Sequence, residues 1–140
     1  MRRSLWDPVR WVFPGLVTLL LAGCGVLLPP DAELVRRFET SRAVFDSLAA
    51  LADADTSVTF LAHREDLQRR MHRFGLWGLQ RRWGELAFPV GSNNAGWQKV
   101  YVRIASTCIE PVASLDGPFA VTNSYRQLEV GWYLALRTAD

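Results

Sequence analysis

The segment after Pro30 carries a helical pattern of apolar positions. Apolar residues recur there at spacings of four, seven and three residues: Leu34, Phe38, Phe45 and Leu48. This spacing gathers apolar side chains along one face of a helix. Asp31 is a favourable N-cap, because its side chain can accept a hydrogen bond from a free amide of the first turn. We therefore expect one helix of about five turns over residues 31–51, with its apolar face in the core.

A second helical pattern begins at about Arg64. Leu67, Met71 and Phe74 follow at spacings of four and three residues. Gly75 comes where a left-handed residue ends many helices. Between the two helices, residues 57–61 alternate in polarity and predict a short strand or an extended linker.

After Gly75 the apolar period changes to two, which is typical of strands. We expect strands at residues 76–83, 85–90, 97–104, 119–128 and 132–137. Turn-forming residues occupy 91–96 and 129–131, and such short connections imply antiparallel pairing. The pattern predicts an α+β fold with two N-terminal helices packed on one face of an antiparallel sheet, in a single domain over residues 31–140.

The N-terminus has a different pattern, namely three arginines followed by an uncharged apolar run over residues 11–22. A membrane-spanning helix needs ~20 apolar residues, so this shorter run predicts a secretory signal. The run ends in Leu21-Ala22-Gly23-Cys24, which resembles the bacterial lipobox. That resemblance implies cleavage before Cys24, a diacylglyceryl group on its thiol and acylation, for example with palmitate, of its new amine. Residues 1–23 would then be a signal peptide and residues 24–30 a lipidated tether.

Lipid on Cys24 would anchor the domain to a membrane, facing the periplasm or the exterior. By resemblance to Gram-negative lipoproteins, in which Asp at the next position favours the inner membrane, Gly25 points to the outer membrane. An uncleaved N-terminal anchor over residues 11–28 is the alternative. Cys108 would be left as a single thiol, and we expect it to be buried as a small apolar residue.

The net charge of +2 resides in the N-terminal segment. Three of the sixteen basic and one of the fourteen acidic residues lie within residues 1–23, so the remainder carries thirteen of each. Binding to nucleic acid depends mainly on neutralising phosphates with excess basic residues. This balance argues against nucleic acid as a partner.

The sequence contains no recognisable catalytic or metal-binding constellation. His63 and His72 lie nine residues apart without a cysteine pair, and zinc sites need several ligands at closer spacing. We therefore expect no enzyme activity, no metal and no cofactor. One basic cluster could form a surface for an anionic partner: Arg69, Arg70, Arg73, Arg81 and Arg82.

Trp77 and Trp83 lie within this cluster, and arginine beside tryptophan can grip anionic headgroups or an acidic protein face. The alternative is a solvated helix face balanced by Glu65, Asp66 and Glu85.

The folded part also resembles a family of uncharacterised small bacterial lipoproteins. The matching features are the helix with Phe38, Phe45 and Leu48 that ends in Asp53, Arg64 at the second helix, Lys99-Val100-Tyr101, residues 111–116 and residues 131–134. Members tend to have Gly-Tyr where this chain has Val100-Tyr101. The resemblance implies the architecture and no particular activity.

These observations favour a lipid-anchored cell-envelope protein with a small non-catalytic domain that binds a protein or cell-wall partner. The alternative is a small envelope hydrolase or ligand carrier with a pocket between helices and sheet, formed by Glu110, Asp116 or His63. A purely structural coat protein is a third hypothesis.

Overall fold

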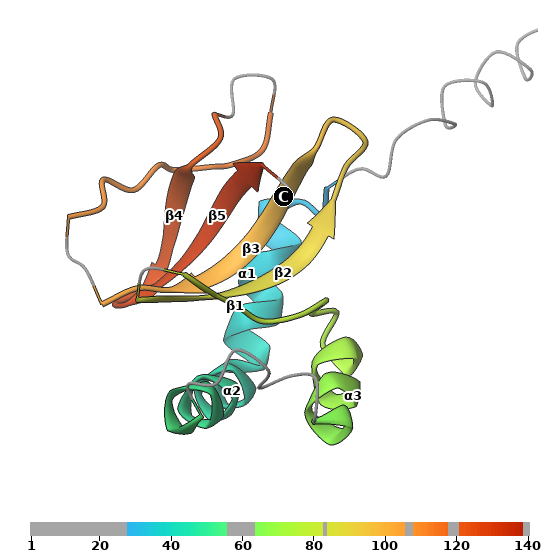
Figure 1. Ribbon diagram of the computed structural model, residues 1–140. Coiled ribbons are helices and arrows are strands. Elements are labelled where there is room, and N and C mark those ends of the chain that lie inside the picture. Colours follow the sequence, from blue (N-terminus) through green and yellow to red (C-terminus); the bar gives the residue numbers. More distant parts are fainter. Residues whose placement is uncertain (1–27, 56–63, 83, 106–107, 118–120, 139–140) are drawn as a thin grey trace, which may run out of the picture.

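The computed structural model describes residues 28–55, 64–82, 84–105, 108–117 and 121–138 (Figure 1). The helices are α1 (Asp31–Thr40), α2 (Arg42–Ala54) and α3 (Glu65–Arg73). The strands are β1 (Gln80–Arg82), β2 (Glu85–Ser92), β3 (Trp97–Arg103), β4 (Ser124–Glu129) and β5 (Trp132–Thr138). Helices followed by an antiparallel sheet confirm the predicted α+β class. The predicted signal peptide, Cys24 and the segment 57–61 lie outside the described residues.

The five strands form one sheet in the order β1-β2-β3-β5-β4, with every neighbouring pair antiparallel. Two hairpins confirm the predicted turns: Gly96 (φ 77°) closes β2 onto β3, and Gly131 (φ 82°) joins β4 to β5. The connection from β3 to β4 passes β5, so β5 lies between them.

Strand β1 is shorter than the predicted strand 76–83. The register between β1 and β2 would bring residue 78 opposite Pro89, and proline has no amide hydrogen to donate to a ladder. At this position the Trp77 amide donates a hydrogen bond to the Pro89 carbonyl at 2.7 Å, outside the regular ladder. Regular pairing therefore starts at Gln80. The predicted strand 119–128 likewise begins later, at Ser124.

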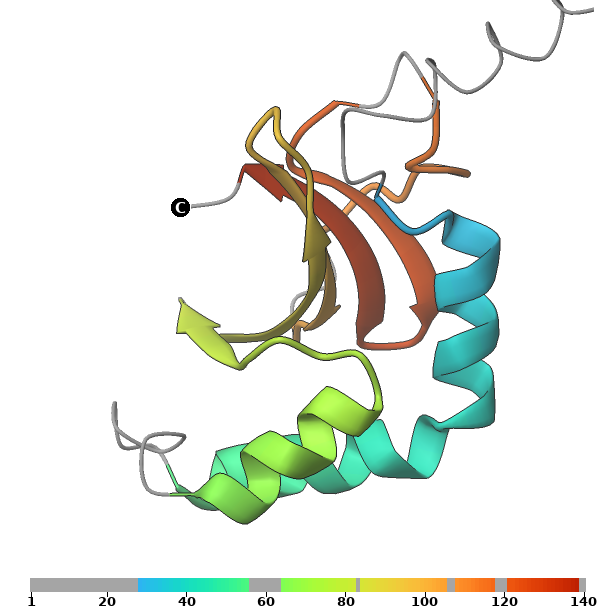
Figure 2. The same ribbon diagram turned by 90° about the vertical axis from the view of Figure 1, so that its right-hand side faces the viewer.

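The helix predicted over residues 31–51 is divided at Ser41 into α1 and α2, which meet at a sharp angle (Figure 2). The Thr40 hydroxyl donates to the carbonyls of Arg36 and Arg37, and the Ser41 amide is shared between the carbonyls of Arg37 and Phe38. Hydroxyl back-bonding of this kind competes with the regular helical ladder and favours a bend. The bend lets α1 run along the sheet and α2 pass beneath it.

The main core lies between the three helices and one face of the sheet (Figure 2). Its centre is a group of aromatic rings in contact with one another: Phe38, Phe45, Phe88, Tyr101 and Trp132. Aromatic pairs contribute about 0.5–1.5 kcal/mol beyond the burial of their area. The other face carries a smaller cluster of buried residues: Ala87, Val100, Val102, Ile104, Tyr133 and Ala135.

Helix α3 ends at the predicted glycine. Gly75 has φ 68°, and its amide donates to the His72 carbonyl at 3.0 Å, while the Leu76 amide donates to the Met71 carbonyl at 3.0 Å. These two bonds form a Schellman motif, which stops the helix and turns the chain toward the sheet. Within the described part of the chain, no helix has the length and apolar character needed to cross a membrane.

Candidate functional site

A buried cluster of charges lies where the chain enters the fold. Lys99, on β3, has a side chain only 2% exposed, and its ammonium donates to the Pro29 carbonyl at 2.9 Å, to Asp31 at 2.7 Å and to Asp116. These three bonds use all three hydrogens of the ammonium. A lysine at this position can therefore be buried without an unsatisfied donor.

Asp31 is the centre of this cluster. Its second carboxylate oxygen accepts hydrogen bonds from the Leu115 amide at 2.7 Å, the Ser114 hydroxyl at 3.2 Å and Arg126 at 3.1 Å. Burial alone would raise the pKa of Asp31, but the bonds from the Leu115 amide and from Lys99 outweigh it, and the pKa lies below its usual value. Asp31 therefore stays ionised.

The expectation that Asp31 caps the first helix is wrong in its detail. Pro30 is the N-cap residue, and Asp31 is the first residue of α1. Its backbone amide donates to the Asp116 carboxylate at 2.9 Å, so a residue distant in sequence accepts from the helix N-terminus. The side chain of Asp31 is free to bind Lys99 because the cap comes from elsewhere.

Together these groups form what we call the Lys99 network: Lys99, Asp31, Ser114, Leu115, Asp116, Arg126 and the Pro29 carbonyl. It joins the start of α1 to β3, β4 and the irregular segment before β4. Leu28 also packs against the core, and a methyl group on Gly91 would lie 3.3 Å from Cδ of Pro29. The last residues of the predicted tether 24–30 therefore belong to the folded domain.

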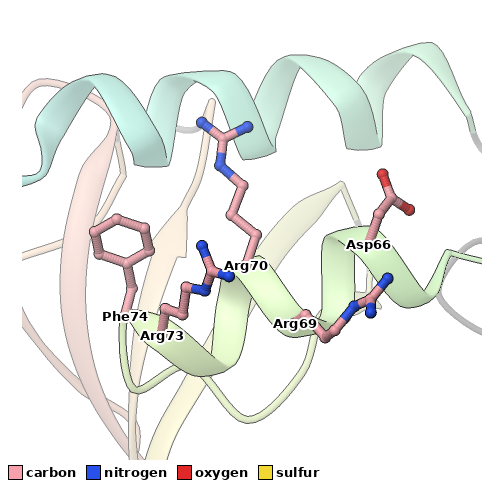
Figure 3. Close-up of a pocket in the computed structure, with 5 residues that line it drawn as sticks. All are labelled: Asp66, Arg69, Arg70, Arg73 and Phe74. Atoms are coloured by element: carbon pink, nitrogen blue, oxygen red, sulfur yellow. The ribbon is translucent and has the colours of Figure 1, made fainter.

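The predicted arginine surface is divided by the fold. Arg69, Arg70 and Arg73 are exposed on α3 and line a hollow of about 540 Å³ together with Asp66 and Phe74. We call this the α3 hollow. Figure 3 shows the three arginines projecting from α3, with Arg70 reaching toward α2.

The other two predicted arginines lie on β1, away from the α3 hollow. Arg81 donates to the carbonyls of Ala52 and Asp55, at the C-terminal end of α2, where carbonyls lack helical partners. Arg82 lines a small polar pocket of about 60 Å³ beside Glu85 and Arg137. Trp83 is not among the described residues.

Two of the three carboxylates expected to balance the arginine surface, Asp66 and Glu85, have other partners, and the third, Glu65, is exposed at the start of α3. Asp66 lies 3.3 Å from Arg64, which lowers the pKa of Asp66 through a hydrogen bond. Glu85 binds Arg137 at 2.6 Å. Neither carboxylate has an ion pair with Arg69, Arg70 or Arg73 among the contacts of the described residues.

A second hollow of about 220 Å³ lies along another side of α3. His72 and Trp77 line it, and Trp77 is 60% exposed. Trp77 lies four residues after Arg73, the last residue of α3.

The remaining candidate residues are dispersed. Cys108 is exposed, contrary to the expected burial, because it lies in the irregular segment after β3, which runs over the surface. Glu110 is also exposed, whereas Asp116 belongs to the Lys99 network. His63 lies outside the described residues.

Sequence reasoning missed the Lys99 network as a unit. One signal could have found it: Lys99 is the only lysine of the chain, and in the alternation of its strand it falls between Trp97 and Tyr101. Its partners come from segments up to 70 residues away, and no local pattern links them.

Comparisons of the chain with models of protein families, with curated proteins and with solved structures gave no match in any of the three.

Proposed function

We propose that the chain is a lipid-anchored protein of the bacterial cell envelope, with a small non-catalytic domain that binds a protein or cell-wall partner. The lipobox Leu21-Ala22-Gly23-Cys24 is the sequence feature behind the anchor. Lipid on Cys24 with a second chain on its amine would make membrane attachment lasting, since each buried methylene contributes ~0.8 kcal/mol. Gly25 favours the outer membrane.

One structural observation carries the proposal. The Lys99 network and the packing of Leu28 hold the chain in the domain from residue 28 onward. Leu28 is four residue steps after Cys24, a distance of at most ~14 Å along the chain. A domain that begins so soon after the lipobox would be held close to the membrane surface, which suits a module that presents one face outward.

The hydrolase or carrier alternative depends on convergent polar groups. Asp116 is bound to Lys99 and accepts from the amide of Asp31, so this carboxylate takes part in the fold. Glu110 is exposed, and His63 lies outside the described residues. These placements support the binding module over the alternative.

Metabolic labelling tests the anchor. Cells that express the chain are grown with an alkyne-bearing palmitate, and the purified chain is probed for the label. We expect labelling of the native chain and of Cys108→Ser, the matched control, and none of Cys24→Ser. Equal labelling of Cys24→Ser, or no label on the native chain, would contradict the anchor.

Cross-linking in intact cells tests the docking role. We expect the native chain to recover an envelope component reproducibly and Cys24→Ser to recover less of it, because the unanchored domain leaves the membrane surface. A native chain that recovers no envelope component would count against a binding module and favour the coat-protein hypothesis.

A further inference from the structure

The arginines of the α3 hollow differ from most arginines of this domain. Six other arginines each bind a carboxylate side chain within the described part of the chain: Arg37, Arg42, Arg64, Arg103, Arg126 and Arg137. Arg69, Arg70 and Arg73 have no such partner among the described residues. Among the described residues, Arg69, Arg70 and Arg73 thus gather around one hollow without a carboxylate partner, whereas Arg36, which also lacks one, lies apart on α1.

The geometry of α3 brings these three charges together. Arg69 and Arg73 are four residues apart, which places their Cβ atoms about 5–6 Å apart on one side of the helix. Arg70 adds a third guanidinium that reaches toward α2 (Figure 3). Like charges so close repel one another, and an anionic ligand would relieve that repulsion.

The hollow also has an apolar side. Phe74 lies half-buried in its lining, beside the three arginines and Asp66. A volume of about 540 Å³ is much larger than a single phosphate or carboxylate needs. Arginine is enriched at binding hot spots between proteins.

The α3 hollow lies at the far end of the domain from the chain's start. Pro29 lies beside Gly91, near the end of β2 that leads into the β2–β3 hairpin. Figures 1 and 2 show α3 at the opposite end of the domain, beneath the sheet. With at most ~14 Å of chain between Cys24 and Leu28, lipid on Cys24 would hold the α3 hollow away from the headgroups of the anchoring membrane.

We infer that the α3 hollow is a docking site for an acidic segment of another envelope protein, whose carboxylates bind Arg69, Arg70 and Arg73. This inference deepens the proposed binding role and rests on it for its cellular setting. Arginine binds carboxylates bidentately and with directional hydrogen bonds. An apolar side chain of the segment would contact Phe74, which explains why the hollow combines charge with an aromatic ring.

A binding measurement on the full chain in detergent tests the site. The probe is a fluorescent synthetic peptide rich in glutamate and phenylalanine, and its matched control has glutamine in place of every glutamate. We expect the acidic peptide alone to bind, with an affinity that falls as salt rises, because exposed charges are screened. The double variant Arg69→Gln/Arg73→Gln should weaken binding by at least about tenfold.

Arg36→Gln is the matched control variant, because Arg36 is an exposed arginine on α1 with no carboxylate partner among the described residues. It should bind the acidic peptide as the native chain does. Three results would overturn the inference: equal binding of the glutamine peptide, equal binding by the double variant, or equal weakening by Arg36→Gln. Circular dichroism confirms that each variant is folded.

Vesicles containing phosphatidylglycerol distinguish a lipid headgroup from a protein segment. We expect such vesicles to bind Cys24→Ser equally with and without Arg69→Gln/Arg73→Gln. If vesicle binding depends on these arginines, the ligand of the α3 hollow is an anionic lipid and not an acidic protein segment. Because Cys24→Ser should still bind the acidic peptide, failure of the anchor and failure of this site give different results.

Discussion

Lys99 shows how one residue can determine where a chain enters its fold. A buried ammonium is costly unless every hydrogen is bonded. Here the Pro29 carbonyl, Asp31 and Asp116 satisfy all three hydrogens. Because these partners come from three separate segments, the network specifies one arrangement of the N-terminus, the sheet and the segment before β4.

Removing Lys99 should strongly destabilise the domain. In Lys99→Met the Asp31 carboxylate keeps Arg126 and the Leu115 amide but loses its buried counter-charge. We expect a loss of about 3–5 kcal/mol in the free energy of unfolding, measured by urea denaturation. Arg36→Met on the exposed side of α1 should change it by less than about 0.5 kcal/mol. Similar small losses for both variants would show that the network contributes little.

Stability should also fall in acid because of Asp31. Its pKa in the folded state lies below the usual value of 3.8, at which it titrates when unfolded. The stabilisation that ionised Asp31 contributes is therefore complete above the pKa of Asp31 in the unfolded chain. It is lost as the pH falls through the lower pKa of Asp31 in the folded state. Urea denaturation from about pH 6 to about pH 3 should show a steeper loss for the native chain than for Asp31→Asn. Parallel curves would contradict this assignment.

At the scale of elements, local patterns predicted most of the secondary structure. Apolar spacing located α3, β2, β3 and β5 to within about two residues, because the period of each element matches the face that it buries, whereas β1 and β4 begin four and five residues later than predicted. The bend at Ser41 was not predicted, because the spacing of Phe38 and Phe45 also fits the apolar stripe of a straight helix. In the structure both rings contact Trp132 from the two sides of the bend. The order of β5 and β4 was not predicted, because it depends on pairing across the sheet.

The end of α3 offers a test at this scale. Gly75→Ala should destabilise the domain by about 1–2 kcal/mol, because a left-handed backbone disfavours any side chain. The new methyl group would also lie 2.5 Å from a nitrogen of Arg37. Gly78→Ala is the matched control, because a methyl group there has no neighbour within 4 Å. Thermal unfolding of the two variants checks this, and equal melting temperatures would contradict it.

At the scale of the whole molecule, the short link to Cys24 has a geometric consequence. The β2–β3 hairpin lies beside Pro29, and α3 lies at the other end (Figure 1). A domain anchored through Cys24 should therefore keep the hairpin near the bilayer and α3 away from it. The arginines of α3 would then face the envelope space, where a partner can reach them.

Energy transfer measures this orientation. A fluorophore is attached at Asn94→Cys in the hairpin or at His72→Cys on α3, in a Cys108→Ser background that prevents labelling of the exposed native thiol. With the lipidated chain in vesicles that contain acceptor lipids, we expect more transfer from position 94 than from position 72. Equal transfer, or the reverse order, would show that the domain does not hold this orientation.

The location, the tether and the outward orientation of α3 all depend on the proposed lipid on Cys24. Intact-mass spectrometry of the full chain purified from its native membrane measures it directly. We predict a chain that begins at residue 24 and carries the added mass of a diacylglyceryl group and an amide-linked acyl chain. A chain that retains Met1, or an unmodified Cys24, would contradict it.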